Sequence, residues 1–401
     1  MRARLPGERE QTILVCALIG AAQMTWGSIV PVLPLFMEQF GLGVVMLGPV
    51  IAAFAVGRVV ANIPAGLALR WWRPRWYLHS VLIALALVTA VTGFAAAPGF
   101  LIAARVLAGV LGGAAVTIGF AVLVAGAPAE RRGRAMATAT VVQMGAAAVG
   151  SLVGGIAVTY VGVQGAFIAS AVPLLLVIGW DVLRPAAFYW DAHTRSVSAL
   201  DVEHQRGPAP RARLSGGWGL LAALAGVSFA AFFARFAGEQ GLIPVMAYGE
   251  GGMTPIGLGI ALAAGTVASL LVLGPVGRWV DRGARTSVVL VSAVAASAVL
   301  IALPMLGEPF GFAVAVVLYS VATSVTNIVP GVVTGEQYTS REVGTVVGIT
   351  RTAGDAGAAI GPLVVFALAA TSAIAGLVVM AAVLLVASAM LCAVMIHKSA
   401  R

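Results

Sequence analysis

Apolar runs of roughly twenty or more residues recur along the chain from Thr12 to His397. An α-helix needs about 20 apolar residues to cross the hydrocarbon core of a bilayer, so each run is long enough to span a membrane. Hydrophobic residues make up 60% of the 401 residues and charged residues only 10%, which is too little charge to cover a soluble domain of this size. The segments of about ten residues with alternating polarity that build a membrane β-barrel are missing. These features predict an all-α membrane protein.

Glycine, proline and charge clusters interrupt the apolar sequence and divide it into twelve predicted transmembrane helices. Their approximate bounds are residues 11–36, 45–69, 77–97, 99–126, 135–161, 164–184, 216–247, 253–280, 286–306, 308–335, 342–370 and 372–397. Pro31, Pro34 and Pro244 fall inside the first and seventh of these helices. They predict kinks there, because proline lacks the N–H of the helical hydrogen bond.

Basic residues fall in alternate predicted loops. They include Arg2, Arg75, Arg134, Arg184 and Lys398, whereas the loops on the opposite side contain no Lys or Arg. By the positive-inside rule, this pattern predicts a multi-pass protein of the cytoplasmic (inner) membrane with both termini in the cytoplasm. The net charge of +9 is then explained by orientation in the bilayer, so we expect no binding to nucleic acid.

The longest polar segment, residues 185–215, lies near the middle of the chain. We expect an N-terminal six-helix bundle over residues 1–184, this segment as a cytoplasmic linker, and a C-terminal six-helix bundle over residues 216–401. Within the linker, the sequence WDAHTRSVSALDVEH favours a short amphipathic helix at the membrane surface. His193 and His204 stand alone there, so we expect them to be solvated rather than to bind a metal.

The two halves of the chain repeat one another. Residues 132–155 align with residues 342–365 at an offset of 211, which matches Gly150 with Gly361. Duplicated bundles of helices are typical of secondary transporters, in which one bundle rocks against the other around a central site. Glycine and alanine are so abundant in the chain that this match alone is weak evidence. It supports a duplication mainly when it is taken together with the symmetry of the loop charges.

Short motifs then carry a family resemblance. The first copy of a loop motif, PAGLALRWWRPR (64–75), follows the second predicted helix, and its second copy, GRWVDRGAR (277–285), follows the eighth. The first copy has Arg70 where the second has Asp281. RVLAGVLGGAA and GAAAVGSLVGG lie in the fourth and fifth helices. Together these motifs resemble the major facilitator superfamily, and within it most closely the twelve-span drug:proton antiporters. The resemblance implies two pseudo-symmetric six-helix bundles and secondary active transport.

The same resemblance implies a cytoplasmic latch between the halves. Its candidate residues are Gly66, Arg70, Arg73, Asp281, Arg282, Arg285 and Glu342. Family packing places Asp281 near Arg131, Arg132 and Arg134, where a helix N-terminus and the cations favour a carboxylate. In the altered copy we expect Arg70 or Arg73 to meet Glu342. The alternative is that these charges only anchor their loops, since exposed ion pairs contribute little.

Six ionisable residues fall well inside the predicted helices: Arg58, Arg105, Arg235, Glu239, Arg351 and Asp355. Each costs at least about 2.5 kcal/mol when it faces lipid, so we expect all of them to face protein or a water-filled cavity. The candidates for proton coupling are Asp355, Glu239, Arg105 and Arg58. Asp355 has two candidate partners, Arg351 one turn away in its own helix and Arg58 in the other half. Only the second makes Asp355 a moving part rather than a fixed brace.

The resemblance also implies a central cavity that the fourth and seventh helices help to line. The candidate residues are Gln23, Trp26, Phe232, Arg235, Glu239, Tyr319 and Asn327. Arg235 and Glu239 are four residues apart, so on an α-helix they share a face and either neutralise each other or bind substrate. The aromatic side chains either form an apolar wall or simply pack.

We therefore expect a proton-coupled transporter that exports a small amphipathic or drug-like compound by alternating access. The alternative is uptake or exchange of a small metabolite or organic anion, which the excess of arginine favours. An enzyme or a channel is a remote alternative, because no H-E-x-x-H, G-x-S-x-G or nucleotide-binding G-K-[ST] motif is present. The expected partners are the substrate, protons and the lipid bilayer, with no cofactor and a monomeric state.

Overall fold

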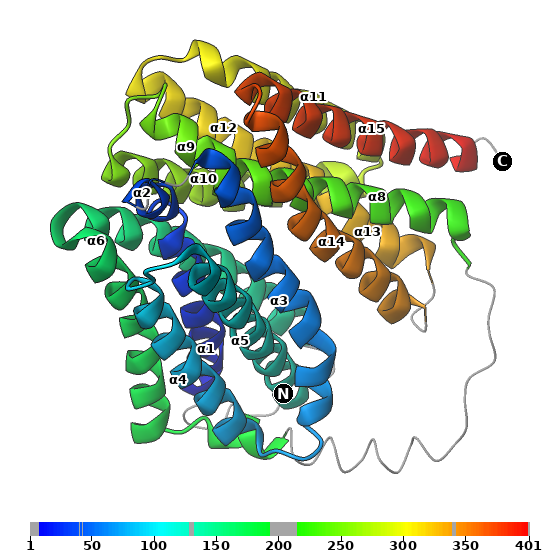
Figure 1. Cartoon of the computed structure of the whole chain (residues 1–401). Coiled ribbons are helices and arrows are strands. Elements are labelled where there is room, and N and C mark those ends of the chain that lie inside the picture. The colour runs from blue at the N-terminus through cyan, green and yellow to red at the C-terminus, as the bar shows by residue number, and fades with distance from the viewer. Residues whose placement is uncertain are drawn as a thin grey trace. The chain divides into compact units, whose positions relative to one another are not determined.

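The structure, a computed structural model, describes residues 8–39, 41, 43–127, 132–192, 215–338 and 342–399. In these residues every regular element is helical (Figure 1). The helices are α1 (Glu8–Ile29), α2 (Leu33–Gln39), η1 (Val44–Met46), α3 (Leu47–Ala68), α4 (Pro74–Thr92), α5 (Pro98–Gly126), α6 (Arg132–Leu183), α8 (Trp218–Ala234), η4 (Arg235–Leu242), α9 (Ile243–Tyr248), α10 (Pro255–Asp281), α11 (Arg285–Ala302), η5 (Leu303–Met305), α12 (Pro309–Thr326), α13 (Ile328–Gln337), α14 (Val343–Ala369) and α15 (Ala373–Ser399).

The chain divides into two compact units. The first comprises Met1–Ile29 and Gly57–Pro210, and the second comprises Val30–Val56 and Arg211–Arg401. The second unit therefore includes α2 and the beginning of α3, which lie before the linker that the sequence predicts as the boundary. Most of that linker, including His193 and His204, lies outside the described residues.

The described residues contain eleven helical segments that are long and apolar enough to cross a membrane. Helix α6 counts once although it covers 52 residues, too many for one crossing. Its backbone is broken at Gly162, which has φ 71° and ψ −176°. The ribbon of α6 changes direction within its length (Figure 1). Gly162 lies between the predicted helices 135–161 and 164–184, so α6 supplies two of the twelve expected crossings.

Proline breaks the first predicted helix as expected. Helix α1 ends at Ile29, residues 30–32 form a turn that contains Pro31, and α2 begins at Leu33. The break replaces a kinked helix with two separate helices. Proline also begins several helices, where its missing N–H costs nothing because that group has no partner within the helix. At α10, Pro255 follows Thr254, whose Oγ1 accepts a hydrogen bond from the Gly257 N–H at 3.1 Å.

Glycine allows α1 and α6 to approach closely in the first unit. A Cβ atom at Gly150 would collide with the backbone carbonyl of Met24, and one at Gly27 would collide with that of Ala147. Ser151 donates a hydrogen bond to the carbonyl of Gly27 at 3.1 Å. In lipid, where burial of apolar surface gives no net driving force, such close packing and hydrogen bonds hold helices together.

The second unit uses the same device between α8 and α14. A Cβ atom at Gly357 would collide with the carbonyl of Phe229, and one at Gly361 would lie 2.7 Å from that of Phe233. Gly361 is the residue that the internal repeat aligns with Gly150. Both copies of the repeat therefore place glycine at a close contact between helices, which is a stronger correspondence than sequence identity alone.

The beginning of α3 packs in the second unit against α14. A Cβ atom at Gly48 would lie 2.8 Å from the carbonyl of Pro362 and 3.0 Å from Cβ of Phe366. The contact joins the second predicted helix to the eleventh. It also explains why residues 30–56 group with the second unit.

We expect Gly357→Ala to destabilise the protein by about 1–3 kcal/mol, because the added methyl group meets backbone that cannot move without separating α8 from α14. Gly348→Ala in the same helix is the matched control, since no atom lies within 4 Å of the site. It should keep or raise stability, because alanine favours helix by up to about 1 kcal/mol. Thermal unfolding of the purified variants measures both. Equal unfolding midpoints would show that the helices tolerate separation.

Candidate functional site

The seventh predicted helix contains a π-helical segment of eight residues, η4 (Arg235–Leu242), between α8 and α9. The N–H of Ile243 donates to the carbonyl of Gly238, five residues earlier. Pro244 follows directly, and its ring would clash with the carbonyl four residues earlier in a regular α-helix, so a wider turn relieves the strain. π-Helical turns are rare and occur frequently at functional sites. The kink predicted from Pro244 therefore takes the form of η4.

Arg235 is the first residue of this π-helical segment and Glu239 lies within it. Both side chains are half-buried. Within the described part of the chain they form no ion pair, so the self-neutralising pair is not formed. Nε of Arg235 and Oε1 of Gln240 are buried and have no hydrogen-bond partner in the described residues.

Tyr319 on α12 fixes the start of η4. The side chain is fully buried, and its hydroxyl donates to the carbonyl of Ala234 at 3.0 Å. A Cβ atom at Gly238 would lie 3.0 Å from the same hydroxyl. Tyr319 therefore holds the π-helical segment in place. The sequence had suggested it as a residue of the cavity wall.

Phe232 contributes an aromatic face beside η4. Its ring stacks on that of Phe236, with centroids 6.3 Å apart and an interplanar angle of 18°. It also lies against α14, since a Cβ atom at Gly354 would be 3.1 Å from its Cδ2. Asn327, by contrast, lies exposed at the junction of α12 and α13.

Asp355 on α14 is only 5% exposed. Arg351, the partner available one turn away in the same helix, is exposed and forms no ion pair with it. The local pair is therefore not used. Arg58 belongs to the first unit, where it is half-buried and its backbone packs against Gly113 of α5. The predicted pairing of Arg58 with Asp355 stays a prediction.

The first unit has its own polar cluster on α1, α5 and α6. Arg105 is 1% exposed, and its guanidinium carbon lies 4.8 Å from the centroid of the Trp26 ring. Such a cation–π contact is worth about 2 kcal/mol or more when it is shielded from water. One turn before Trp26, Gln23 accepts a hydrogen bond from Gln143 at 3.4 Å. The structure thus brings together Gln23, Trp26 and Arg105, three residues predicted separately from the sequence.

Two of the latch candidates, Arg285 and Glu342, have partners within their own unit that the latch did not predict. Arg285 forms an ion pair with Glu336 at 2.8 Å. Glu342 accepts hydrogen bonds from the backbone and the hydroxyl of Ser215. Burial and the neighbouring Glu342 carboxylate raise the pKa of Tyr338.

Gly66, Arg70, Arg73, Asp281 and Arg282 are exposed. Arg131 lies outside the described residues, as does the side chain of Arg132. The latch between the halves stays a prediction.

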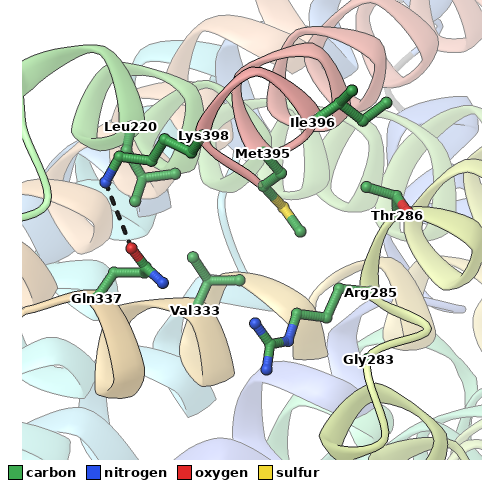
Figure 2. A pocket seen from close by; sticks show the side chains of 9 residues that line it. All are labelled: Leu220, Gly283, Arg285, Thr286, Val333, Gln337, Met395, Ile396 and Lys398. Carbon is green, nitrogen blue, oxygen red and sulfur yellow. Dashed lines mark hydrogen bonds between the residues drawn. The ribbon is translucent and has the colours of Figure 1, made fainter. Parts of the chain in front are cut away.

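A cavity of about 590 Å³ lies within the second unit, where the beginning of α11 meets the ends of α13 and α15 (Figure 2). Val333 and Met395 supply apolar walls, and Lys398 donates to Gln337 Oε1 at 3.4 Å. Arg285 also lines it, but Glu336 already pairs with that charge. None of the residues predicted for the substrate cavity lines this space, so we do not assign it to the substrate.

One charged cluster was missed by the sequence predictions. Asp181 near the end of α6 is fully buried, and its carboxylate lies 2.8 Å from Arg75 Nε and 3.0 Å from His79 Nε2. It also accepts hydrogen bonds from the indole of Trp190 and the N–H of Ala186, both at 3.1 Å. The sequence did contain one sign of this cluster, because Asp181 is a single acidic residue near the end of an apolar helix. The cluster closes the end of the first unit and holds the segment that follows α6.

The family of the chain is established by sequence comparison. The profile of the Major Facilitator Superfamily matches residues 15–236 and 224–400. Comparison with curated protein sequences finds no match.

Solved structures share the fold. A bacterial homolog of the human lysosomal transporter Spinster, in an inward-facing and occupied conformation, has a TM-score of 0.76 at 14% identity over 98% of each chain. The human organic anion transporter TETRAN has a TM-score of 0.64 at 18% identity over 96% of this chain and all (100%) of its own. The nucleoside transporter NupG has a TM-score of 0.66 at 12% identity over 96% of this chain and 99% of its own. With the helical fold and the family match over nearly the whole sequence, this chain belongs to the Major Facilitator Superfamily and is a multi-pass membrane transporter.

Proposed function

We propose that the protein couples proton movement to the export of a small amphipathic compound across the cytoplasmic membrane, by alternating access and with both termini in the cytoplasm. Family membership implies a transporter of small molecules rather than an enzyme. We add three points to family membership: proton coupling, the direction of transport and the chemical class of the substrate. The monomeric state and the two six-helix bundles on either side of the linker are also part of the proposal.

The burial of Asp355 carries the proposal of proton coupling. Ionisable residues inside a membrane protein are expensive, and acids there mark proton relays. Asp355 is buried and Arg351, one turn away, is exposed, so proton binding to Asp355 would change the charge of a buried site. A change of charge within a packed helix interface is a physical means of shifting the balance between two conformations.

The residues of η4 support an amphipathic substrate. Arg235 supplies a cation with a buried unsatisfied Nε, Glu239 supplies a carboxylate, and Gln240 supplies an unsatisfied amide oxygen. The stacked rings of Phe232 and Phe236 add an apolar surface beside them. Sites for small molecules combine such apolar walls with a few polar groups that fix orientation.

The test is dye efflux from cells that express the protein, with and without an uncoupler that collapses the proton gradient. We expect export of a fluorescent amphipathic dye to exceed that of cells without the protein and to stop when the uncoupler is added. Efflux that continues at the same rate in the presence of the uncoupler would reject proton coupling.

Uptake or exchange of an organic anion is the second candidate. The observation that favours it is Arg235, whose buried Nε lacks an acceptor in the described residues. A similar fold serves a human organic anion transporter, although that likeness concerns the fold alone.

Arg235→Gln separates the two candidates. A hydrogen bond to a charged group is worth about 1.5–3 kcal/mol, so loss of Arg235 should weaken binding of an anionic substrate by roughly 10–100-fold. Cationic and neutral substrates should keep their affinity. Arg351→Gln is the matched control, because Arg351 is exposed and unpaired within its unit. A thermal-shift screen of both variants against anionic, neutral and cationic compounds gives the result, and an equal response to all three classes would remove Arg235 from the site.

A further inference from the structure

The loop between α3 and α4 has the sequence RWWRPRW, residues 70–76, which we name the Trp–Arg loop. The helices on either side are membrane-spanning segments that end at Ala68 and begin at Pro74. The loop therefore lies at a membrane surface. Its composition is unusual for a short connection, because it holds three of the eight tryptophans in the protein.

The three tryptophans of this loop point away from the protein. Trp71, Trp72 and Trp76 are 77%, 59% and 65% exposed. Such large apolar rings are not left in bulk water without a cost. Tryptophan is enriched at the interface between lipid and water, where the ring lies among the headgroups.

The loop also carries charge that no acidic residue in the described part of its unit neutralises. Arg70 and Arg73 are exposed and form no ion pair with an acidic residue of the described first unit. Residues 69–79 contain no Asp or Glu. Two guanidinium groups thus flank a pair of exposed indoles.

Arg75 fixes the loop to the rest of the unit. Its Nε donates to the Asp181 carboxylate at 2.8 Å, and its Nη2 donates to the Asp181 backbone carbonyl at 2.9 Å. Its guanidinium carbon also lies 5.8 Å from the centroid of the Trp76 ring. The third arginine is therefore structural. It holds the two free arginines and the tryptophans in a defined position.

We propose that the Trp–Arg loop binds the phosphate groups of anionic phospholipids at the surface of the bilayer. Arg70 and Arg73 supply planar, permanently charged groups that match phosphate oxygens, and the tryptophans insert among the headgroups. The loop thereby makes the stability of the first unit depend on lipid composition. The aspartate found in the second copy of the loop motif, Asp281, would be repelled by such a surface, whereas Arg70 is attracted to it.

The experiment measures thermal unfolding of the full-length protein in two kinds of nanodisc, one of phosphatidylcholine alone and one with added phosphatidylglycerol. We expect phosphatidylglycerol to raise the unfolding midpoint of the wild type, because a ligand that binds the folded state stabilises it. The Arg70→Gln/Arg73→Gln variant should need roughly tenfold more phosphatidylglycerol for the same rise, since each surface arginine contributes to attraction by anionic lipid. High salt should reduce the response of the wild type.

Arg134→Gln/Arg278→Gln is the matched control. It removes the same charge from two other exposed positions, one in the first turn of α6 and one in the last turn of α10, on the same predicted side of the membrane. This variant should keep the wild-type response, and Arg70→Lys/Arg73→Lys should retain most of it. An equal response of all variants, or no response of the wild type, would overturn the proposal. Inorganic phosphate added to phosphatidylcholine discs should leave the unfolding midpoint unchanged, because free phosphate offers no headgroup layer into which the tryptophans can insert. Stabilisation by free phosphate would instead indicate a soluble anion site.

Discussion

Asp181→Ala is expected to lower the free energy of unfolding by about 3–5 kcal/mol, because it breaks a buried charge pair and leaves the partner charge without compensation. Asp181 is the common acceptor for Arg75, His79, Trp190 and the N–H of Ala186. Its removal leaves several buried donors unsatisfied at once. The change should also release the Trp–Arg loop, since Arg75 loses its acceptor.

Thermal unfolding in detergent measures the effect, and Glu10→Ala is the matched control. Glu10 also pairs with an arginine, Arg184, but both side chains are exposed, at 39% and 71%. Water screens such a pair, so the control should leave the unfolding midpoint nearly unchanged. If the two variants unfold at the same temperature, the Asp181 cluster is not a structural centre of the first unit. Asp181→Asn should fall between them, because it keeps an acceptor oxygen but loses the charge.

Features that the bilayer imposes on every membrane-spanning helix could be predicted from the sequence. Apolar length and loop charge predicted the crossings, because the bilayer imposes both on any helix that spans it. Even the break at Gly162 fell between two predicted helices. The close contacts at Gly150 and Gly361 followed from the internal repeat, since small residues are what close helix contact requires.

Side-chain partners were harder to predict, because they come from distant parts of the chain. Asp181 and Arg75 are 106 residues apart, and no local pattern links them. The spacing of Arg235 and Glu239 places them on one face of the helix, but it does not decide whether they pair with each other. Pro244 predicts a disturbed helix, but a kinked α-helix and a π-helix follow equally well from a proline. The outcome depends on contacts such as the one from Tyr319 to Ala234.

Asp355→Asn is expected to abolish proton-driven accumulation of substrate while substrate exchange continues. A difference of one pH unit across the membrane supplies about 1.4 kcal/mol for each proton that crosses. If one proton moves per substrate molecule, this free energy supports a roughly tenfold ratio of substrate concentration between the two sides. An asparagine of nearly the same shape cannot carry the proton, so the ratio should fall to about 1. Proteoliposomes with an acidic lumen, loaded with a fluorescent dye that the wild type exports, measure this ratio directly.

Two further carboxylate variants make the result specific to Asp355. Glu239→Gln removes the other acidic candidate for proton coupling, and Glu250→Gln removes an exposed acid in a loop. If Asp355 is the proton carrier, both keep a pH-dependent ratio, although Glu239→Gln changes affinity because it alters η4. If Glu239→Gln alone loses the ratio, the carrier is Glu239. Dye exchange between the two sides at equal pH must persist in Asp355→Asn, because its loss would indicate that the carboxylate braces the fold. Persistent exchange with no accumulation is the combination that only a proton-carrying Asp355 produces.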